Sequence, residues 1–312
     1  MHRTQNVAIS SVTRALNLVG DRWNQLIIQE VFRGAGGFED LLAGTGATRN
    51  TLSTRLRGLV ANGVLEQRAQ RQGGARKNYH LTEKGQDLFS WILLVWSWGI
   101  RWQSVASNGP TVLSHTTCGK AMLPVPVCGH CHGRISVHNC RYETGEGAGD
   151  EEIRVPRLHQ RRRKGGDEAQ RELDVVDMTA DRWTGMVLST QYFGLHKFDE
   201  MLQHLSIASN ILSDRLRALV SNGVFERRIY AMTPPRYDYW MTSKGKDLYP
   251  QALTLLQWGD RWLASAGPPV IVIHKQCEQP VEIRLVCSEC DGDLAHDNVV
   301  EKRGRDRIKP KD

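Results

Sequence analysis

Two stretches of the sequence carry histidine and cysteine at spacings suited to binding a metal ion. The same pattern, His-x2-Cys-x9-Cys-x2-Cys, occurs in both stretches. Its positions are His115, Cys118, Cys128 and Cys131, and then His274, Cys277, Cys287 and Cys290. A Cys-x2-Cys pair brings two thiolates to one tetrahedral ion, and the upstream His-x2-Cys pair supplies two further ligands. The spacing predicts two structural zinc ions, one in each stretch, with no open position for catalysis.

Other interpretations of these cysteines remain open. They could be remnants that pack as small apolar residues. They could also do thiol redox chemistry through the Cys-x2-Cys pairs, although neither pair lies in a strand-helix-strand context. His130, His132 and Cys140 also lie close to the first pattern, and we interpret them as bystanders.

The metal pattern belongs to a longer internal repeat. Aligning residues 21–102 with 181–262 at an offset of 160 needs no gap and gives 31 identities in 82 positions. After a slip of one residue, the Cys/His pattern recurs at an offset of 159. Each copy is therefore a module followed by a Cys/His appendix.

The repeat predicts six segments in the 312 residues. They are a first winged helix-turn-helix module (1–108), its appendix (109–140), a charged flexible linker (141–172), a second module (173–266), its appendix (267–300) and a charged tail (301–312). The linker contains the basic run 161–164, which could touch DNA phosphates. We favour a solvated charge run there.

Hydrophobic spacing and turn residues predict the elements of a module. In the first copy they indicate helices over 12–19 and 23–32, one starting at 38, and one over 48–61 that ends at Asn62-Gly63. Two short strands, 64–68 and 77–81, follow around a turn at 72–74, and a last long helix runs from 82 through 98. This predicts a mainly α fold with small β wings (α+β): two winged helix-turn-helix domains in tandem.

The fourth helix is the candidate for reading DNA. Leu52, Leu56 and Leu59 share one face and should be buried, as should Leu212, Leu216 and Leu219 in the second copy. Small polar residues and arginine occupy the opposite face, which suits a helix in the major groove. These candidates are Arg49, Asn50, Ser53, Thr54 and Arg57, and in the second copy Ser209, Asn210, Ser213, Asp214 and Arg217.

Basic residues of the wings are candidates for phosphate contacts, which set register without reading sequence. They are Arg68, Arg76 and Lys77 in the first copy and Arg228 and Arg236 in the second.

The motifs of both modules resemble those of the HxlR-type transcriptional regulators. The first copy has Ala15-Leu16-x-Leu18-x-Gly20-x2-Trp23, Leu52-x2-Arg55-Leu56-x2-Leu59 and Tyr79-x-Leu81-Thr82-x2-Gly85. The second has Trp183, Leu212-x2-Arg215-Leu216-x2-Leu219 and Tyr239-x-Met241-Thr242-x2-Gly245. The resemblance implies a DNA-binding regulator that works as a dimer through its first and last helices.

Composition limits the remaining possibilities. The formal net charge is +7, with 41 Lys and Arg against 34 Asp and Glu, which is compatible with binding a polyanion. No apolar run is long enough to span a membrane, and the first residues do not resemble a signal peptide, so we expect a cytoplasmic protein. No catalytic motif is present, so we expect no enzyme.

The sequence thus predicts a sequence-specific regulator of double-stranded DNA, most simply a repressor. Its modules would act as an intrachain pseudo-dimer on paired half-sites, or pair between chains as a homodimer. A zinc-bearing protein-interaction adaptor without specific DNA binding is the alternative.

Overall fold

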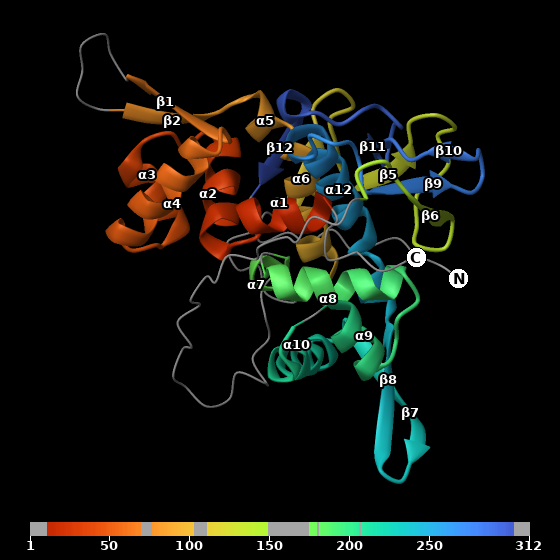
Figure 1. The fold of residues 1–312 in the computed structure, drawn as a ribbon. Coiled ribbons are helices and arrows are strands. Elements are labelled where there is room, and N and C mark those ends of the chain that lie inside the picture. Colours follow the sequence, from red (N-terminus) through yellow and green to blue (C-terminus); the bar gives the residue numbers. More distant parts are fainter. Residues whose placement is uncertain are drawn as a thin grey trace. The chain divides into compact units, whose positions relative to one another are not determined.

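The computed structural model describes residues 11–69, 77–102, 111–148, 175–179, 181–205 and 207–302 (Figure 1). The chain divides into two compact units. Unit I, built around the first repeat, comprises Leu18–Pro126, Val175–Asp181 and Arg284–Asp312. Unit II, built around the second repeat, comprises Met1–Asn17, Val127–Asp174 and Arg182–Ile283. Each unit therefore contains segments of both repeats.

Unit I contains the first helix-turn-helix. Its helices are α2 (Arg22–Phe32), α3 (Phe38–Thr45), α4 (Arg49–Ala61), α5 (Glu83–Gln86) and α6 (Phe89–Trp102). The wing is an antiparallel hairpin of β1 (Leu65–Ala69) and β2 (Lys77–Leu81). The predicted turn at 72–74 and Arg76 lie outside the described residues.

Unit II repeats this order of elements. It has α8 (Arg182–Tyr192), α9 (Phe198–Leu205), α10 (Ser209–Ser221), the wing strands β7 (Phe225–Met232) and β8 (Pro235–Met241), α11 (Ser243–Lys246) and α12 (Tyr249–Leu263). Helices and two-stranded wings in this order confirm the predicted fold class in both repeats.

The leucine stripes form the core under α4 and α10, as the helical spacing predicts. Leu52, Leu56 and Leu59 are buried, and so are Leu212, Leu216 and Leu219. Both helices end where a glycine adopts the left-handed conformation, with φ of 68° at Gly63 and 66° at Gly223. A β-carbon disfavours that conformation, so glycine allows the chain to leave the helix and enter the wing.

The structure corrects three predicted boundaries. The last long helix is two helices, because the amide of Leu88 bonds to the carbonyl of Gly85 and tightens the chain into a turn between α5 and α6. Order continues beyond residue 140, since β6 (Cys140–Thr144) occupies the start of the predicted linker. Strand β12 (Val299–Lys302) likewise includes the start of the predicted tail. The basic run at 161–164 lies outside the described residues.

The first helices of the two repeats are exchanged between the units. Helix α7 (Val175–Thr179) precedes the second repeat in sequence but packs in unit I against α2 and α6. There the Gln25 side chain donates to Thr179 Oγ1 at 3.0 Å. Residues 11–17 of α1 (Ser11–Val19) pack in unit II, where a β-carbon on Gly259 would lie 2.3 Å from the Ser11 carbonyl oxygen. This close approach requires glycine on α12.

The strands of the two appendices are exchanged as well. In unit I, β3 (Val112–His115) pairs with β4 (Lys120–Met122) on one side and with β12 on the other. In unit II, β9 (Val270–His274) pairs with β10 (Gln279–Pro280) and with β6. Each three-stranded sheet therefore has strands from both appendices. Strands β5 (Pro124–Cys128) and β11 (Ile283–Cys287) each continue along the chain from one unit into the other.

Among the described residues, no helix combines the length and apolar composition that crossing a bilayer requires.

The exchanged helix α1 is attached to α12 through a carboxyl group that should make stability depend on pH. Ser11 Oγ donates to Asp260, and Arg14 donates to the Leu263 carbonyl at 3.3 Å. Burial raises the pKa of Asp260 to about 6, although the Ser11 hydrogen bond and the charge of Arg14 oppose the shift. The folded chain therefore holds this proton more tightly than the unfolded chain.

We expect the thermal midpoint of the wild-type chain to fall, relative to Asp260→Asn, as the pH rises through about 6. Stabilisation by the neutral carboxyl is complete below about pH 4 and is lost above the folded-state pKa. At neutral pH the variant should be about 1 kcal/mol more stable, an estimate reduced for partial solvent screening. Calorimetry at several pH values measures this, and a constant difference across the range would contradict it.

Candidate nucleic-acid interface and metal clusters

The polar face of α4 is open to solvent. Arg49, Asn50, Thr54 and Arg57 are exposed, and Ser53 is half-buried at the edge of this stripe. The Thr48 side chain caps the helix by accepting from the Thr51 amide. A capped helix with its leucines buried presents these side chains in a fixed orientation, as major-groove reading requires.

Helix α10 presents the corresponding residues. Ser209, Asn210, Asp214 and Arg217 are exposed, and Ser213 is half-buried. The N-cap residue here is Ala208, which makes no side-chain cap hydrogen bond. The amide of Ile211, which corresponds to that of Thr51, bonds instead to the Ala208 carbonyl at 3.0 Å.

Charge differs between the two exposed faces. Arg217 pairs with Asp214 at 3.1 Å, whereas Arg57 faces the neutral hydroxyl of Thr54 at 3.5 Å. Arg49 forms two hydrogen bonds with Glu39, at 2.8 and 2.9 Å, and these bonds raise the pKa of Arg49. All these groups are exposed, so the ion pairs are weak and a phosphate can displace the carboxylate.

The wings carry their basic residues on exposed strand positions. Arg68 pairs with Glu66, and Arg228 pairs with Glu226 at the corresponding place. Lys77 donates to Gln67 at 3.3 Å, and Arg236 is exposed. Basic side chains of the two wings thus lie in solvent, within reach of a polyanion.

The eight predicted metal ligands form two clusters, but not the predicted ones. One cluster, in unit I, consists of His115, Cys118, Cys287 and Cys290. The other, in unit II, consists of Cys128, Cys131, His274 and Cys277. The expectation that each appendix forms its own site is wrong. The His-x2-Cys pair of one repeat meets the Cys-x2-Cys pair of the other, because the strands that carry them are exchanged.

Similar turns position the two Cys-x2-Cys pairs. The Cys128 amide bonds to the Gly133 carbonyl at 2.9 Å, and the Cys287 amide bonds to the Gly292 carbonyl at 2.9 Å. The glycine lies against the histidine contributed by the other repeat. A β-carbon on Gly292 would be 3.1 Å from His115 Cε1, so a larger residue would press on the ligand.

The ligand atoms have the spacing of a tetrahedral site. The sulfurs of Cys118 and Cys287 are 3.9 Å apart, and those of Cys128 and Cys277 are 3.8 Å apart. With zinc–sulfur bonds of about 2.3 Å, tetrahedral geometry gives sulfur–sulfur distances of about 3.8 Å. All ligand atoms of a cluster lie within 4.8 Å of one another. Each cluster can therefore hold one metal ion with three sulfurs and one nitrogen.

The histidines face the sulfurs through Nδ1. His115 Nδ1 is 3.3 Å from Cys290 Sγ, and His274 Nδ1 is 3.3 Å from Cys131 Sγ. The other ring nitrogen, Nε2, is buried in both histidines without a partner among the described residues. A neutral ring protonated on Nε2 would leave Nδ1 free to bind a metal ion.

Backbone amides favour the thiolate form at one cysteine of each cluster. The Lys120 amide lowers the pKa of Cys118. Burial raises the pKa of Cys128, but hydrogen bonds from the amides of Cys131 and His130 outweigh it and leave the pKa below its usual value. Burial raises the pKa of Cys277 and Cys287 instead, so the form that binds metal is favoured at Cys118 and Cys128.

The cluster of unit I is connected to the end of helix α2. Arg33 bonds to Glu30 at 2.7 Å and to Glu301 of β12 at 2.9 Å, and the Arg33 side chain is only 8% exposed. His296 Nε2, in the short helix η3 (His296–Asn298), donates to the Phe32 carbonyl at 2.8 Å. These contacts join the metal-binding sheet to the helix that packs on α4.

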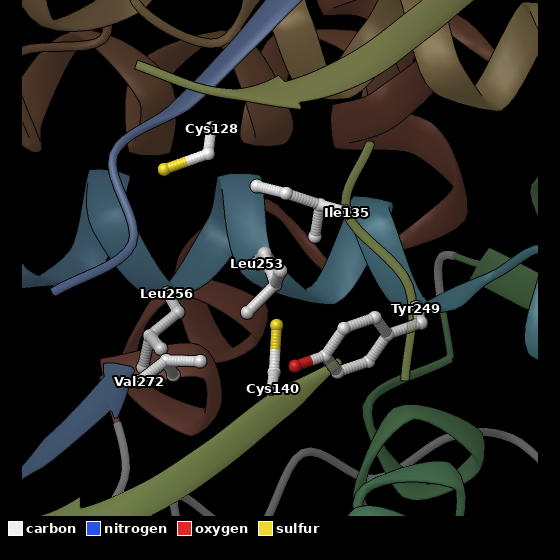
Figure 2. Packing of buried hydrophobic residues seen from close by; sticks show 7 residues of the cluster. All are labelled: Cys128, Ile135, Cys140, Tyr249, Leu253, Leu256 and Val272. Atoms are coloured by element: carbon white, nitrogen blue, oxygen red, sulfur yellow. The ribbon is translucent and has the colours of Figure 1, made fainter. Parts of the chain in front are cut away.

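The cluster of unit II rests on α12 (Figure 2). Cys128 and Cys140 lie in one buried core with Tyr249, Leu253 and other apolar side chains. The hydroxyl groups of Tyr249 and Tyr142 are 2.8 Å apart. Burial raises the pKa of Cys140, which therefore stays a neutral core thiol.

The sequence pattern identified all eight residues of the two clusters but did not indicate the exchange. His130, His132 and Cys140 fall outside both clusters, in line with their interpretation as bystanders. No signal in the spacing distinguishes the two groupings, because the motif is the same in both repeats. The contacts of Arg33 with Glu301 and of His296 with the Phe32 carbonyl carried no recognisable motif.

The family model described as "HxlR-like helix-turn-helix" matches residues 18–107 and 178–266. The uncharacterized HTH-type transcriptional regulator Rv3095 of Mycobacterium tuberculosis is 35% identical over 130 residues, which are 41% of this chain and 82% of the relative. The regulator sll1512 of Synechocystis, also named as uncharacterized and HTH-type, is 30% identical over 90 residues, 28% of this chain and 67% of the relative.

The solved structure of PA1374 from Pseudomonas aeruginosa is 33% identical, covers 35% of this chain and 75% of that chain, and has a TM-score of 0.30. Both repeats match the same family model, and together the matches span more than half of the chain. The chain belongs to the HxlR-like helix-turn-helix family of transcriptional regulators, with two copies of the family domain in one polypeptide.

Proposed function

We propose that this regulator represses transcription by occupying paired DNA half-sites with α4 and α10 of a single chain. The observation that carries the proposal is the presence of two recognition helices, each with an exposed polar stripe opposite a buried leucine stripe. A tether between two modules raises the effective concentration of the second once the first has bound. A chain held across a promoter excludes the transcription machinery.

The two half-sites should differ. Arg57 is free to approach a guanine edge, whereas Arg217 is held by Asp214 and must leave that carboxylate first. Asp214 can instead accept from a cytosine amino group. We therefore propose a non-palindromic operator with its half-sites about one helical turn apart.

We further propose that each Cys/His cluster holds one structural zinc ion. Support comes from the sulfur–sulfur distances and from the donor set of three sulfurs and one nitrogen. Bound zinc would supply strong cross-links between segments far apart in the sequence, and the closed ligand set leaves no position for a substrate. The ions would thereby hold the appendices that brace α2 and α12.

Replacing Arg57 by Ala should weaken binding to the selected operator by about 1–3 kcal/mol, because a base-edge contact is lost. Arg217→Ala should weaken operator binding by less, because the wild-type Arg217 side chain must break its ion pair with Asp214 when it binds DNA. The operator is first obtained by in-vitro selection from genomic fragments, and affinity is measured by fluorescence anisotropy with competitor DNA.

Arg141→Ala is the matched control, because it removes an arginine that is paired with Glu143 and Glu278 in the appendix. Equal affinity of Arg57→Ala and the control would exclude base reading by Arg57. If selection enriches no motif and modest salt abolishes binding, the adaptor alternative replaces the repressor.

A single chain should be enough for the paired site. Light scattering of the purified protein and of its complex with the selected operator should show one chain alone and one chain per duplex. A stable dimer in solution, or two chains per duplex, would show that the modules pair between chains instead.

Double substitutions distinguish the exchanged clusters from sites within one appendix. Cys118→Ser with Cys287→Ser removes two ligands of one observed cluster, so one zinc ion per chain should remain. Cys118→Ser with Cys128→Ser removes one ligand from each cluster and should abolish tight binding at both. Zinc content by mass spectrometry and cobalt absorption measure the outcome.

The opposite pattern, with one ion left in the Cys118/Cys128 variant, would show that each appendix forms its own site. Carefully purified wild-type protein that contains no metal would contradict the zinc proposal itself. Cys140→Ser serves as the control, because this cysteine lies outside both clusters and should leave two ions bound.

A further inference from the structure

The wing of unit II has an apolar tip. Ile229, Tyr230 and Met232 on β7 are 49%, 43% and 72% exposed, and together with Val300 they are the exposed large hydrophobic residues of the described chain. Figure 1 shows the β7–β8 hairpin projecting beyond α9 and α10 of the same unit. Apolar side chains grouped at the end of a projecting element indicate a surface that is covered when the protein works.

The two repeats differ in sequence at the positions of this tip. At the same offset of 160, the first repeat has Ala69, Gln70 and Gln72. The second wing is paired along its length from Phe225 opposite Met241 to Met232 opposite Pro235. Ile229 pairs with Tyr237 and Ala231 with Arg236, so Tyr230 between them is the extra residue of a β-bulge. A bulge changes the direction of the neighbouring side chains.

Basic side chains lie along this wing, from its base to its tip. Arg227 lies over the Tyr237 ring at 4.8 Å, Arg228 over Trp240 at 5.3 Å, and Lys197 over Tyr230 at 5.4 Å. Arg236, opposite Ala231, is exposed. Stacking on aromatic rings orients these cations along the wing, and Arg228 also pairs with Glu226. A phosphate backbone on either side of a narrow groove matches this combination of charge and apolar surface.

The hairpin is held firmly at its base. The Tyr239 amide bonds to the His196 carbonyl at 2.8 Å, and the His196 ring stacks on Trp240 at 3.8 Å. At the same base, β7 begins at Phe225, two residues after the left-handed Gly223 where the chain leaves α10. The tip is thus a rigid extension of the recognition helix, so that docking α10 also determines where the tip meets the DNA.

We propose that the tip of the β7–β8 wing is a minor-groove wedge. Ile229 and Met232 enter the groove beside the half-site read by α10 and unstack one base step, while Arg228 and Arg236 contact the flanking phosphates. This inference rests on the proposed function. The first wing, with its polar residues at these positions, makes no such insertion, so only one half-site is kinked.

The test replaces the tip with the residues of the first repeat, as Ile229→Ala, Tyr230→Gln and Met232→Gln in the full chain. The selected operator carries 2-aminopurine at single positions beside each half-site, because its fluorescence rises when the base unstacks. The wild-type chain should raise the signal severalfold at one step beside the second half-site. The triple variant should lose this rise and bind the operator about tenfold more weakly.

Val300→Gln is the matched control, since it removes an exposed apolar side chain of β12 and leaves the wing intact. It should retain both the fluorescence rise and the affinity. Circular dichroism and melting curves of both variants show whether they are folded.

Several outcomes would overturn the wedge. If the wild-type chain binds its operator without a fluorescence change, the wedge is wrong and the paired half-site proposal stands. The same holds if the triple variant binds with unchanged affinity and signal, or loses only self-association. If selection enriches no operator, the proposed function fails and the wedge fails with it.

Discussion

Each Cys/His cluster is made of two ligands from each repeat, and the arrangement of the chain depends on this exchange. Cys118 lies beside Cys287, and Cys128 beside Cys277. To bring these sulfurs together, β3 must pair with β12 and β6 with β9. The sheets then contact α2 through Arg33 and α12 through Tyr142. A metal ion bound by such a cluster would cross-link residues far apart in sequence, close a long loop and remove much conformational freedom from the unfolded chain.

The helices are exchanged in the same way as the strands: a helix of one repeat packs in the unit built around the other repeat. A short amphipathic helix such as α7 is not stable by itself and needs a surface to bury its apolar side. That surface is provided by α2 and α6 of the other repeat. Helix α1 contacts α12, where Gly259 leaves room for its backbone at Ser11. Neither helix-turn-helix is complete with the residues of its own repeat alone.

Much of the fold follows from local sequence patterns, and the exchange does not. The leucine stripes, the Asn62-Gly63 helix end and the wing strands are predictable because each depends on neighbours within a few residues. The break between α5 and α6 was missed because Asp87 and Leu88 are compatible with a helix. The ligand grouping was missed for a different reason. Two identical motifs can pair in two ways, and only long-range packing decides between them.

The differences between the repeats have a physical consequence for recognition. A symmetric homodimer must present identical residues to both half-sites, because any substitution in the sequence occurs in both subunits. In a tandem chain the two surfaces are independent. The buried leucines and the Cys/His positions are the same in both copies, whereas Thr54 has become Asp214 and Gln72 has become Met232. Thr54 and Asp214 are exposed on α4 and α10, and Met232 is exposed on the second wing. One chain can therefore combine a charged recognition helix with an apolar wing on one side only, and this combination suits an asymmetric operator better than a palindromic one.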